Sequence, residues 1–461
     1  MGIVTLASVL KSRGLKVSVF DCQLRRDFAD GLVKAAETDR KVGFYTTTYS
    51  YHFVREMAKN IKAAYRDAQI ILGGPHASHK PQELVEDFAD IVAIGEAEEI
   101  LPRIVSGEPL ENLPSIAYKN DAGKAIINHG TELFRDLDSV PFPAWDLFEY
   151  KDFRFSHYRR RPLVSMSTSR GCAFKCIYCS SNIVHKYETR TRSVDNVVDE
   201  IQWDVEKFGV REIHVIDDDF TYSVDRVKEL CGRIISRGLN KKVILAKPNA
   251  IRPDRGDQEM FDLLKKAGFY FVAIAVEAVD PEVSKGLRRG VDLEKQLGTI
   301  RMARKSGLFI NTFYLMGSPF DTKESMMKNI AFACKAPTDI VAFFALQPYP
   351  GTVFHNMMVE QGAIEDMSHG QVPSCNEMSS ACEANDWTQK DLKRIIKYGY
   401  RKYYLSPFRM LRLAARLPLF ISDPITLAKL FFNLLFGGSP AADSIKTRKT
   451  IAKKVEKPRE E

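Results

Sequence analysis

The first 106 residues alternate short apolar runs with longer amphipathic stretches. Residues 51–67, for example, carry apolar side chains at helical spacing, which predicts a helix with one buried face. Strands that alternate with helices indicate a parallel sheet covered on both faces, so the pattern predicts a doubly wound, Rossmann-like α/β domain. The expected strands are 16–20 (KVSVF), 42–47 (VGFYTT), 69–74 (QIILGG) and 90–95 (DIVAIG).

This series opens with an expected helix, Ile3 to Lys11, where a doubly wound domain ordinarily begins with a central strand. We therefore expect the first strand to be missing from this chain. From residue 107 the periodic pattern stops, and the prolines of PFPAW (141–145) predict irregular structure to about residue 160. We place a first domain at 1–135 and a linker at 136–160.

A second alternating series follows, in which helical stretches such as 193–209 separate the apolar runs. Six βα units are too few to close an eight-stranded barrel, so the pattern predicts a partial (βα)6 barrel over residues 161–360. Its chemistry is expected at the C-terminal ends of the strands. The expected strands are 162–169, 212–217, 242–247, 271–277, 309–317 and 340–347.

After residue 360 the strand pattern ends, and residues 361–461 are predicted to be a helical region with a basic tail. Residues 386–417 have helical periodicity, with Thr388 as the expected N-cap. The apolar stretch 417–438 is interrupted by charged residues and a proline, so we expect no transmembrane span there. The interrupting residues are Asp423, Pro424, Lys429 and Asn433.

Residues 405–438 also combine apolar side chains with basic ones, namely Arg409, Arg412, Arg416 and Lys429. This composition is typical of a helix that lies on an anionic membrane surface. A helical cap packed on the barrel is the alternative, and the sequence leaves both open.

Charge and cysteine content narrow the class of protein. The chain of 461 residues has a formal net charge of +8, but residues 446–461 hold seven Lys and Arg against three Glu, so nucleic acid is not an expected partner. Eight cysteines are too few for a disulfide scaffold. The N-terminus lacks the features of a signal peptide. These observations predict a cytoplasmic protein. Peripheral contact with the inner face of the membrane is left open by the sequence.

Three cysteines lie within RGCAFKCIYCSS (170–181): Cys172, Cys176 and Cys179. Their loop directly follows the first expected barrel strand. A [4Fe–4S] cluster has four irons that each seek a thiolate, so three cysteines would leave one iron open to a substrate or cofactor, as in catalytic metal sites. The alternatives are a zinc site completed by His185 and cysteines that are merely buried.

The spacing Cys-x3-Cys-x2-Cys, with Tyr178 before the third cysteine, resembles the signature of radical S-adenosylmethionine (SAM) enzymes. Later segments resemble those radical SAM enzymes that carry an N-terminal cobalamin-binding domain, over residues 1–405. The segments are IDDDFT (216–221), AVEA (275–278), LMGSP (315–319), QPYPGT (347–352) and, in the first domain, ILGGPHAS (71–78) and IGEAE (94–98).

The resemblance implies that the open iron chelates SAM and that one electron from the reduced cluster releases a 5′-deoxyadenosyl radical, so that the hard chemistry belongs to the cofactors. It implies Asp218 or Asp219 opposite the methionyl ammonium and Gly317 near the adenosine. Glu277 matches a strand-end acid of the family, although alanines replace the Gly and Ser that usually flank it. An electron donor such as flavodoxin or ferredoxin is an implied partner.

For the first domain the resemblance implies bound cobalamin near Gly73 and Gly74, since paired glycines let a backbone approach a ligand closely. The Asp-x-His-x-x-Gly motif of methionine-synthase-like domains is absent from the sequence. We therefore expect no protein histidine on cobalt, and we interpret His76 as a structural loop residue.

Three function classes follow. The first is cobalamin-dependent radical catalysis on a small-molecule or lipid-like substrate, either C-methylation of an unactivated carbon or a cyclisation or oxidative rearrangement of the anaerobic porphyrin-cyclase kind. A methylthiotransferase would need three more N-terminal cysteines, and only Cys22 precedes the triplet. A non-enzymatic Fe–S or zinc module leaves the six βα units unexplained. Cys375 and Cys382 are too few to hold an auxiliary cluster.

Overall fold

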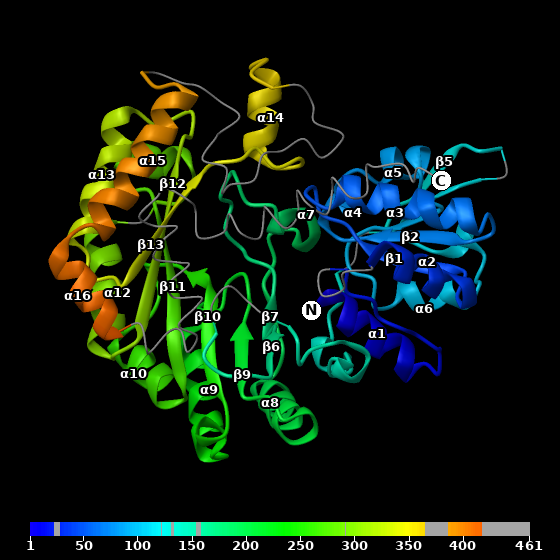
Figure 1. Ribbon diagram of the computed structural model, residues 1–461, viewed down its shortest axis with the longest axis horizontal. Helices are drawn as coiled ribbons and strands as arrows, with labels where there is room; N and C mark the ends of the chain where they lie inside the picture. The colour runs from blue at the N-terminus through cyan, green and yellow to red at the C-terminus, as the bar shows by residue number, and fades with distance from the viewer. Residues whose placement is uncertain are drawn as a thin grey trace.

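The computed structural model describes residues 1–22, 28–120, 122–130, 133–153, 158–290, 292–364 and 386–416. Figure 1 shows two α/β units beside each other: a smaller one, blue to cyan, and a larger one, green to yellow. Each has its own buried apolar core. The motifs named above fall within these ranges, whereas Cys375, Cys382 and residues 417–461 lie outside them.

The smaller unit contains a five-stranded sheet in the order β1-β2-β3-β4-β5. Its strands are β1 (Lys41–Tyr45), β2 (Gln69–Gly73), β3 (Ile91–Ala93), β4 (Ile116–Lys119) and β5 (Ala125–Asn128). The first three are parallel, and β4 and β5 are antiparallel. The helices are α1 (Gly2–Ser12), α2 (Phe28–Thr38), α3 (Tyr51–Ala64), α4 (Pro75–His79), α5 (Pro81–Asp87) and α6 (Ile100–Val105).

Alternate side chains of β2 explain why helices cover both faces of this sheet. Ile70 and Leu72 join an apolar cluster with residues of α2 and α3, whereas Ile71 joins a second cluster with residues of α6. A strand buried on both faces is typical of parallel sheets in doubly wound domains. The predicted α/β class of this domain is therefore confirmed.

The expected strand at residues 16–20 is wrong, because these residues form no regular structure. In the flavodoxin-like strand order 2-1-3-4-5, such a segment would be the edge strand and would pair only with the first strand. No such first strand occurs among the described residues. β1 is consequently at the sheet edge, and its residues are exposed or only half-buried.

The prediction of irregular structure from residue 107 is also wrong, because β4 and β5 form a hairpin that completes the first sheet. The turn is closed by Lys124 N, which donates to Asn120 Oδ1 at 2.9 Å, and Gly123 takes a φ of +73° there. Neither strand alternates apolar with polar positions, and their apolar runs, IAY (116–118) and AII (125–127), are shorter than the run of about four to eight residues that marks a buried strand. From residue 133 to 153 the linker holds only the short turns η2 (Leu137–Ser139) and η3 (Trp145–Leu147) among its described residues.

The larger unit is a six-stranded parallel sheet in the order β13-β12-β11-β10-β9-β6. All nine residues of β11 are buried, as expected of a central strand covered on both faces. The strands are β6 (Leu163–Met166), β9 (Glu212–Val215), β10 (Ile244–Ile251), β11 (Phe269–Glu277), β12 (Phe309–Met316) and β13 (Ile340–Ala345). The six predicted strands and the (βα)6 architecture are confirmed.

Helices follow each of these strands and are named here for reference. They are α8 (Val194–Phe208), α9 (Val224–Ser236), α10 (Gln258–Lys266), α11 (Pro281–Gly286), α12 (Leu293–Lys305), α13 (Lys323–Lys335) and α14 (Val353–Glu360), with the turn η4 (Leu239–Lys241) before β10. Two short strands, β7 (Ser169–Arg170) and β8 (Arg190–Thr191), pair antiparallel around α7 (Ser181–His185). This hairpin carries the three-cysteine loop.

Two C-terminal helices, α15 (Gln389–Tyr404) and α16 (Pro407–Arg416), lie along the outer edge of the larger sheet (Figure 1). Thr388 is the N-cap of α15 as predicted: its hydroxyl accepts from Asp391 N at 3.3 Å, and the Asp391 carboxylate accepts from Thr388 N in return. In the described part of the chain, every helix is too short or too polar to cross a bilayer.

Candidate active site

The cysteine loop leaves the C-terminal end of β6, where the barrel pattern places the chemistry. Gly171 begins the loop with a φ of +81°, and a Cβ atom there would lie 2.1 Å from Glu188 O and 2.8 Å from His185 Cβ. No other residue fits that approach, because the obstructing atom at Glu188 is backbone. Gly171 therefore sets the path of the chain into Cys172.

Backbone hydrogen bonds hold the middle of the loop between two other barrel segments. Ile177 N donates to Leu287 O at 3.4 Å, and Phe354 N, at the start of α14, donates to Ile177 O at 2.9 Å. Within the loop, Cys179 N donates to Cys176 O at 3.2 Å. The loop geometry thus depends on main-chain contacts rather than on the thiols.

The three thiols are the candidate ligands of an iron–sulfur cluster, whose thiolates bind different irons. In the described residues, no three His, Cys, Asp or Glu side chains form a group that could hold a single metal ion. Burial raises the pKa of Cys172 to about 12 and of Cys179 to about 11. An Arg289 guanidinium nitrogen lies 3.8 Å from Cys176 Sγ, so one cationic group faces the site.

His185, the residue that the zinc alternative would use, has partners on one ring nitrogen. Its Nδ1 lies 3.1 Å from Arg190 Nη2 and 3.8 Å from Glu96 Oε1, so the ring is part of a charged network between the two units. Among the described residues, His185 and the cysteines do not form a group that could hold a metal ion.

The three consecutive aspartates after β9 occupy different environments. Asp217 is buried and accepts from Thr168 N, Thr168 Oγ1 and Ser169 Oγ at 2.5–2.7 Å, so it fixes the strand end that leads into the cysteine loop. Asp218 is exposed and accepts from Ser181 Oγ at 2.6 Å. Asp219 is buried, and its Oδ2 has no hydrogen-bond partner.

An unpartnered buried carboxylate oxygen is costly, so Asp219 is the aspartate whose environment fits a ligand cation. Burial raises its pKa, and the nearby guanidinium groups of Arg255 and Arg252 oppose that rise. The negative charge of Asp219 also contributes to the raised pKa of the nearby Cys172 thiol. The sequence alone did not distinguish Asp218 from Asp219; their difference in burial does.

Glu277 ends β11 in a conformation that is rare for a side-chain-bearing residue, with a φ of +65°. It is buried, and its Oε2 has no hydrogen-bond partner. Burial raises its pKa to about 7 against the opposing charges of Arg289 and Arg252. Such backbone strain clusters at functional sites, which agrees with the role that the sequence resemblance implies.

Tyr178 lies between these groups. Burial, followed by the charge of Glu277, raises the pKa of Tyr178 well above its ordinary value, while Arg289 opposes the rise. Arg289 Nη2 also donates to Ala275 O at 2.8 Å. The cysteine loop, the end of β11 and the segment after α11 therefore meet at one place.

Glycines shape the backbone of the LMGSP and QPYPGT segments. Gly317 follows β12 with a φ of +82°, and the next turn is closed by Asp321, which accepts from Ser318 N at 2.8 Å. Gly351 has a φ of +84°, and a Cβ there would lie 2.6 Å from His79 Nδ1 and 2.8 Å from Ile183 Cδ1. Gly351 thus lets the loop before α14 touch both α4 and α7.

The strand ends of the smaller unit present a surface with room for a ligand. A Cβ on Gly73 or Gly95 would meet no heavy atom within 4 Å, whereas one on Gly74, at a φ of +100°, would lie 2.8 Å from Thr46 O. Gly74 therefore packs the loops together, and Gly73 and Gly95 leave open backbone. His76 is buried, with Nδ1 3.3 Å from Thr48 Oγ1, in keeping with a structural role.

A charged network joins the two units directly beside the cysteine loop. Arg170, two residues before Cys172, donates to Glu96 at 2.9 Å and to Glu98 at 2.6 Å, and Arg190 donates to Glu96 at 2.6 Å. Burial would raise the pKa of Glu96, but the two guanidinium groups outweigh it and hold the pKa below its ordinary value. Such partly buried, bidentate arginine pairs position the groups that they join.

Sequence reasoning missed this network, although Glu96 and Glu98 lie within the IGEAE segment that it quoted. It also missed Lys247, inside β10, whose Nζ donates to Asp217 O at 2.8 Å and Asn249 O at 2.7 Å. Burial lowers the pKa of Lys247 to about 8 against the opposing charges of the aspartates after β9. A lysine inside an apolar strand was the available signal, since such a group is rarely buried without a partner.

Family models match both units. A model of the radical SAM superfamily matches residues 166–333, and a model of the B12 binding domain matches residues 1–105. This chain belongs to the radical SAM enzymes that carry a B12-binding domain. The first match contains the three cysteines, Asp219 and Glu277, and the second contains Gly73, Gly74 and Glu96.

Curated relatives align with more than three-quarters of this chain. An uncharacterized methyltransferase of Pyrococcus horikoshii is 25% identical over 420 residues, covering 88% of each chain. A cytidylyl-2-hydroxyethylphosphonate methyltransferase of Streptomyces wedmorensis is 26% identical, covering 79% of this chain and 78% of its own. An anaerobic magnesium-protoporphyrin IX monomethyl ester cyclase of Cereibacter sphaeroides is 23% identical, with coverages of 78% and 58%.

A solved structure supports the fold. The cobalamin-dependent SAM radical enzyme OxsB, with aqua-cobalamin and SAM bound, superimposes with a TM-score of 0.71 at 17% identity, covering 94% of this chain and 68% of that one. The radical SAM domain implies a [4Fe–4S] cluster and SAM as cofactors, and the B12-binding domain implies cobalamin. The predicted enzyme class and cofactors are confirmed, and the individual binding residues stay predictions.

Proposed function

We propose that this enzyme methylates an unactivated carbon of a small-molecule or lipid-like substrate. The observation that carries the proposal is the charged network between Arg170 and Arg190 and the acids Glu96 and Glu98. It holds the cysteine loop against the strand ends of the B12-binding domain, so one substrate position would face both cofactors. When bound, the cluster and SAM would supply hydrogen abstraction from carbon, and the corrinoid would supply a methyl group.

The residues have separate parts in this proposal. Cys172, Cys176 and Cys179 would hold the cluster, and the orphan oxygens of Asp219 and Glu277 would accept hydrogen bonds from polar groups of SAM. The open backbone at Gly73 would face the corrinoid. An electron donor of the flavodoxin or ferredoxin kind would supply the reducing electron.

The named relatives support methylation over its alternative. Two methyltransferases align with this chain over more than three-quarters of their own length, whereas the porphyrin cyclase aligns over 58% of its length. A cyclisation or oxidative rearrangement of the cyclase kind is the second candidate, because the cyclase aligns with 78% of this chain.

The two reactions differ in their nucleoside products. Methylation that uses one SAM for hydrogen abstraction and a second to restore the methyl group yields 5′-deoxyadenosine and S-adenosylhomocysteine together. The test incubates reduced, cobalamin-reconstituted enzyme with SAM and cell extract and quantifies both nucleosides. Comparable amounts of the two support methylation; 5′-deoxyadenosine without S-adenosylhomocysteine moves the assignment to the cyclase-like reaction.

A substitution distinguishes the two candidate aspartates. We expect Asp219→Asn to weaken SAM binding by about tenfold or more, since a buried charge-assisted hydrogen bond contributes roughly 1.5–3 kcal/mol. Asp218→Asn should change SAM affinity by less, because that carboxylate is exposed and already accepts from Ser181. Equilibrium dialysis of SAM against the cluster-loaded proteins measures both, and the reverse ranking would refute the assignment.

A further inference from the structure

The C-terminal helix α15 closes the open edge of the larger sheet. β13 is the edge strand, and tyrosine hydroxyls of α15 bond its outer backbone groups: Phe343 N donates to Tyr400 Oη and Val341 N to Tyr404 Oη, each at 3.1 Å. Exposed strand edges invite pairing with other chains. The tyrosine bonds therefore protect the edge of β13 from pairing with another chain. They also determine which face of α15 points to solvent.

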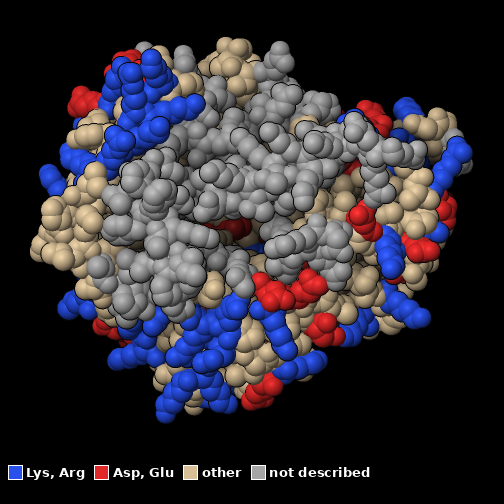
Figure 2. Space-filling model, in the orientation of Figure 1, with Lys and Arg blue, Asp and Glu red and all other residues tan. Residues whose placement is uncertain are grey.

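The outward face of α15 is basic. Asp391, the one acid among residues 389–416, lies at its N-terminus with its carboxylate 3.3 Å from Lys323 Nζ. Figure 2 shows Lys and Arg gathered at the upper left, where Figure 1 places α15. The exposed basic residues of the helix are Lys390, Lys393, Arg394, Lys397, Arg401 and Lys402.

The arginines of α16 point the other way, toward the barrel. Arg416 Nε lies 2.8 Å from Asp339 Oδ1, and its Nη2 donates to Leu308 O at 2.6 Å. The Arg409 guanidinium donates to Cys334 O. The membrane interpretation of the sequence counted these arginines as lipid-facing charges; the structure instead uses them to anchor the helix.

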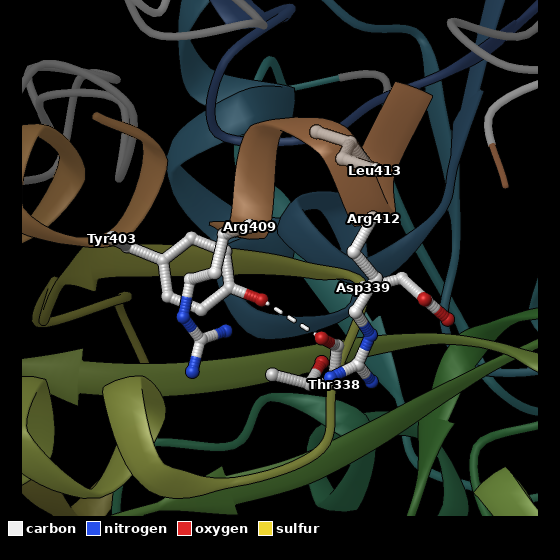
Figure 3. Close-up of a pocket in the computed structure, with 6 residues that line it drawn as sticks. All are labelled: Thr338, Asp339, Tyr403, Arg409, Arg412 and Leu413. Atoms are coloured by element: carbon white, nitrogen blue, oxygen red, sulfur yellow. Dashed lines mark hydrogen bonds between the residues drawn. The ribbon is translucent and has the colours of Figure 1, made fainter. Parts of the chain in front are cut away.

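Figure 3 shows a small cavity beside this anchor, between α16 and the start of β13, where the Tyr403 hydroxyl donates to Thr338 O at 3.0 Å. Asp339 is buried and also accepts from Arg304 at 2.6 Å. The cavity is lined by Thr338, Asp339, Tyr403, Arg409, Arg412 and Leu413. The charged face of α16 is thus the inner one.

Two apolar residues of α16 lie on the outside. Phe408 is 76% exposed and Leu411 73%, and their spacing of three residues places them on one side of the helix. Leu405, 49% exposed, precedes the helix, and Leu413 is buried where it lines the cavity. A surface helix of a globular protein normally turns its apolar residues to the core, but α16 presents two protruding apolar side chains directly after the basic face of α15.

We propose that the outer face of α15 and α16 docks on an anionic lipid bilayer. Phe408 and Leu411 would enter the boundary between headgroups and acyl chains, and the basic residues of α15 would lie against the anionic headgroups. Charge complementarity favours an anionic bilayer over an apolar protein surface, because an apolar surface would provide no negative charge for the six exposed basic residues of α15. The inference is independent of the reaction proposed above.

The experiment is flotation of the full-length protein with vesicles of phosphatidylcholine alone or mixed equally with phosphatidylglycerol. We expect binding to the anionic vesicles that falls with added salt, and at least about tenfold weaker binding to the neutral ones. Phe408→Ser with Leu411→Ser should reduce binding to anionic vesicles by about tenfold or more. Both side chains are exposed, so the folded state should be kept, as circular dichroism melting verifies.

The matched control is Ile3→Ser with Leu293→Ser, two exposed apolar residues on α1 and α12 (44% and 41% exposed), which should leave binding unchanged. Absence of vesicle binding, equal binding to both vesicle types, or full binding by the Phe408→Ser and Leu411→Ser variant overturns the proposal. So does a wild-type dimer in light scattering that this variant converts to monomer, because the face would then belong to a second copy.

Discussion

Replacing Cys172, Cys176 and Cys179 together with Ala should reduce bound iron from about four atoms per chain to near zero and abolish SAM cleavage. The fold should survive, because main-chain bonds of Ile177 hold the loop in place. Anaerobic reconstitution with iron and sulfide, followed by iron quantification and 5′-deoxyadenosine analysis, measures both effects.

A matched control uses the other three described cysteines. Cys22, Cys231 and Cys334 lie outside the loop, and their joint replacement with Ala should leave iron content near that of the wild type. Iron that persists in the loop variant, or that disappears equally in the control, would contradict the assignment of the cluster to these three thiols.

Gly171→Ala should cost most of the iron binding although every thiol remains. The added Cβ would lie 2.1 Å from Glu188 O, and a backbone atom at that distance cannot move aside without displacing the β7–β8 hairpin. The loop would leave its path, and a cluster needs all three thiolates in place. We expect iron content after reconstitution to fall by about tenfold.

Gly209→Ala is the control for this clash. It places a non-glycine residue in the left-handed backbone region without a steric conflict. Gly209 caps α8 with a φ of +63°, and a Cβ there would meet no heavy atom within 4 Å. Its replacement should lower the free energy of unfolding by about 1 kcal/mol and leave the iron bound. Equal iron in the Gly171→Ala variant and the wild type would show that the loop does not depend on this contact.

Parts of the fold were predictable because their signals are local. The apolar run of β11 and the capping residue Thr388 mark a buried strand and a helix start by themselves, and both are observed. The strand predicted at residues 16–20 is wrong for the opposite reason. A strand forms only beside a neighbouring strand, and no local sequence pattern shows whether that neighbour is present. The hairpin of β4 and β5 was missed because each strand has an apolar run of only three residues and no alternation of apolar and polar positions.

The site divides in the same way. The spacing of the cysteines is local and predicted their loop, but the contacts of Arg170 with Glu96 join residues 74 positions apart. The sequence gives no periodic signal for a contact between charged residues so far apart. The pairing of Arg170 with Glu96 is therefore visible only once the two units are packed together. The burial that distinguishes Asp219 from Asp218 also depends on which way each side chain leaves the strand end.

The central claim is that the cysteine loop and the B12-binding domain act on one substrate carbon. The most direct measurement follows the isotopically labelled methyl group of SAM into products by mass spectrometry, with reduced enzyme and cell extract, in the presence and absence of cobalamin. We expect a product that carries the label on carbon and forms only when cobalamin is present. Formation of 5′-deoxyadenosine with no labelled product, and no effect of cobalamin, would contradict it.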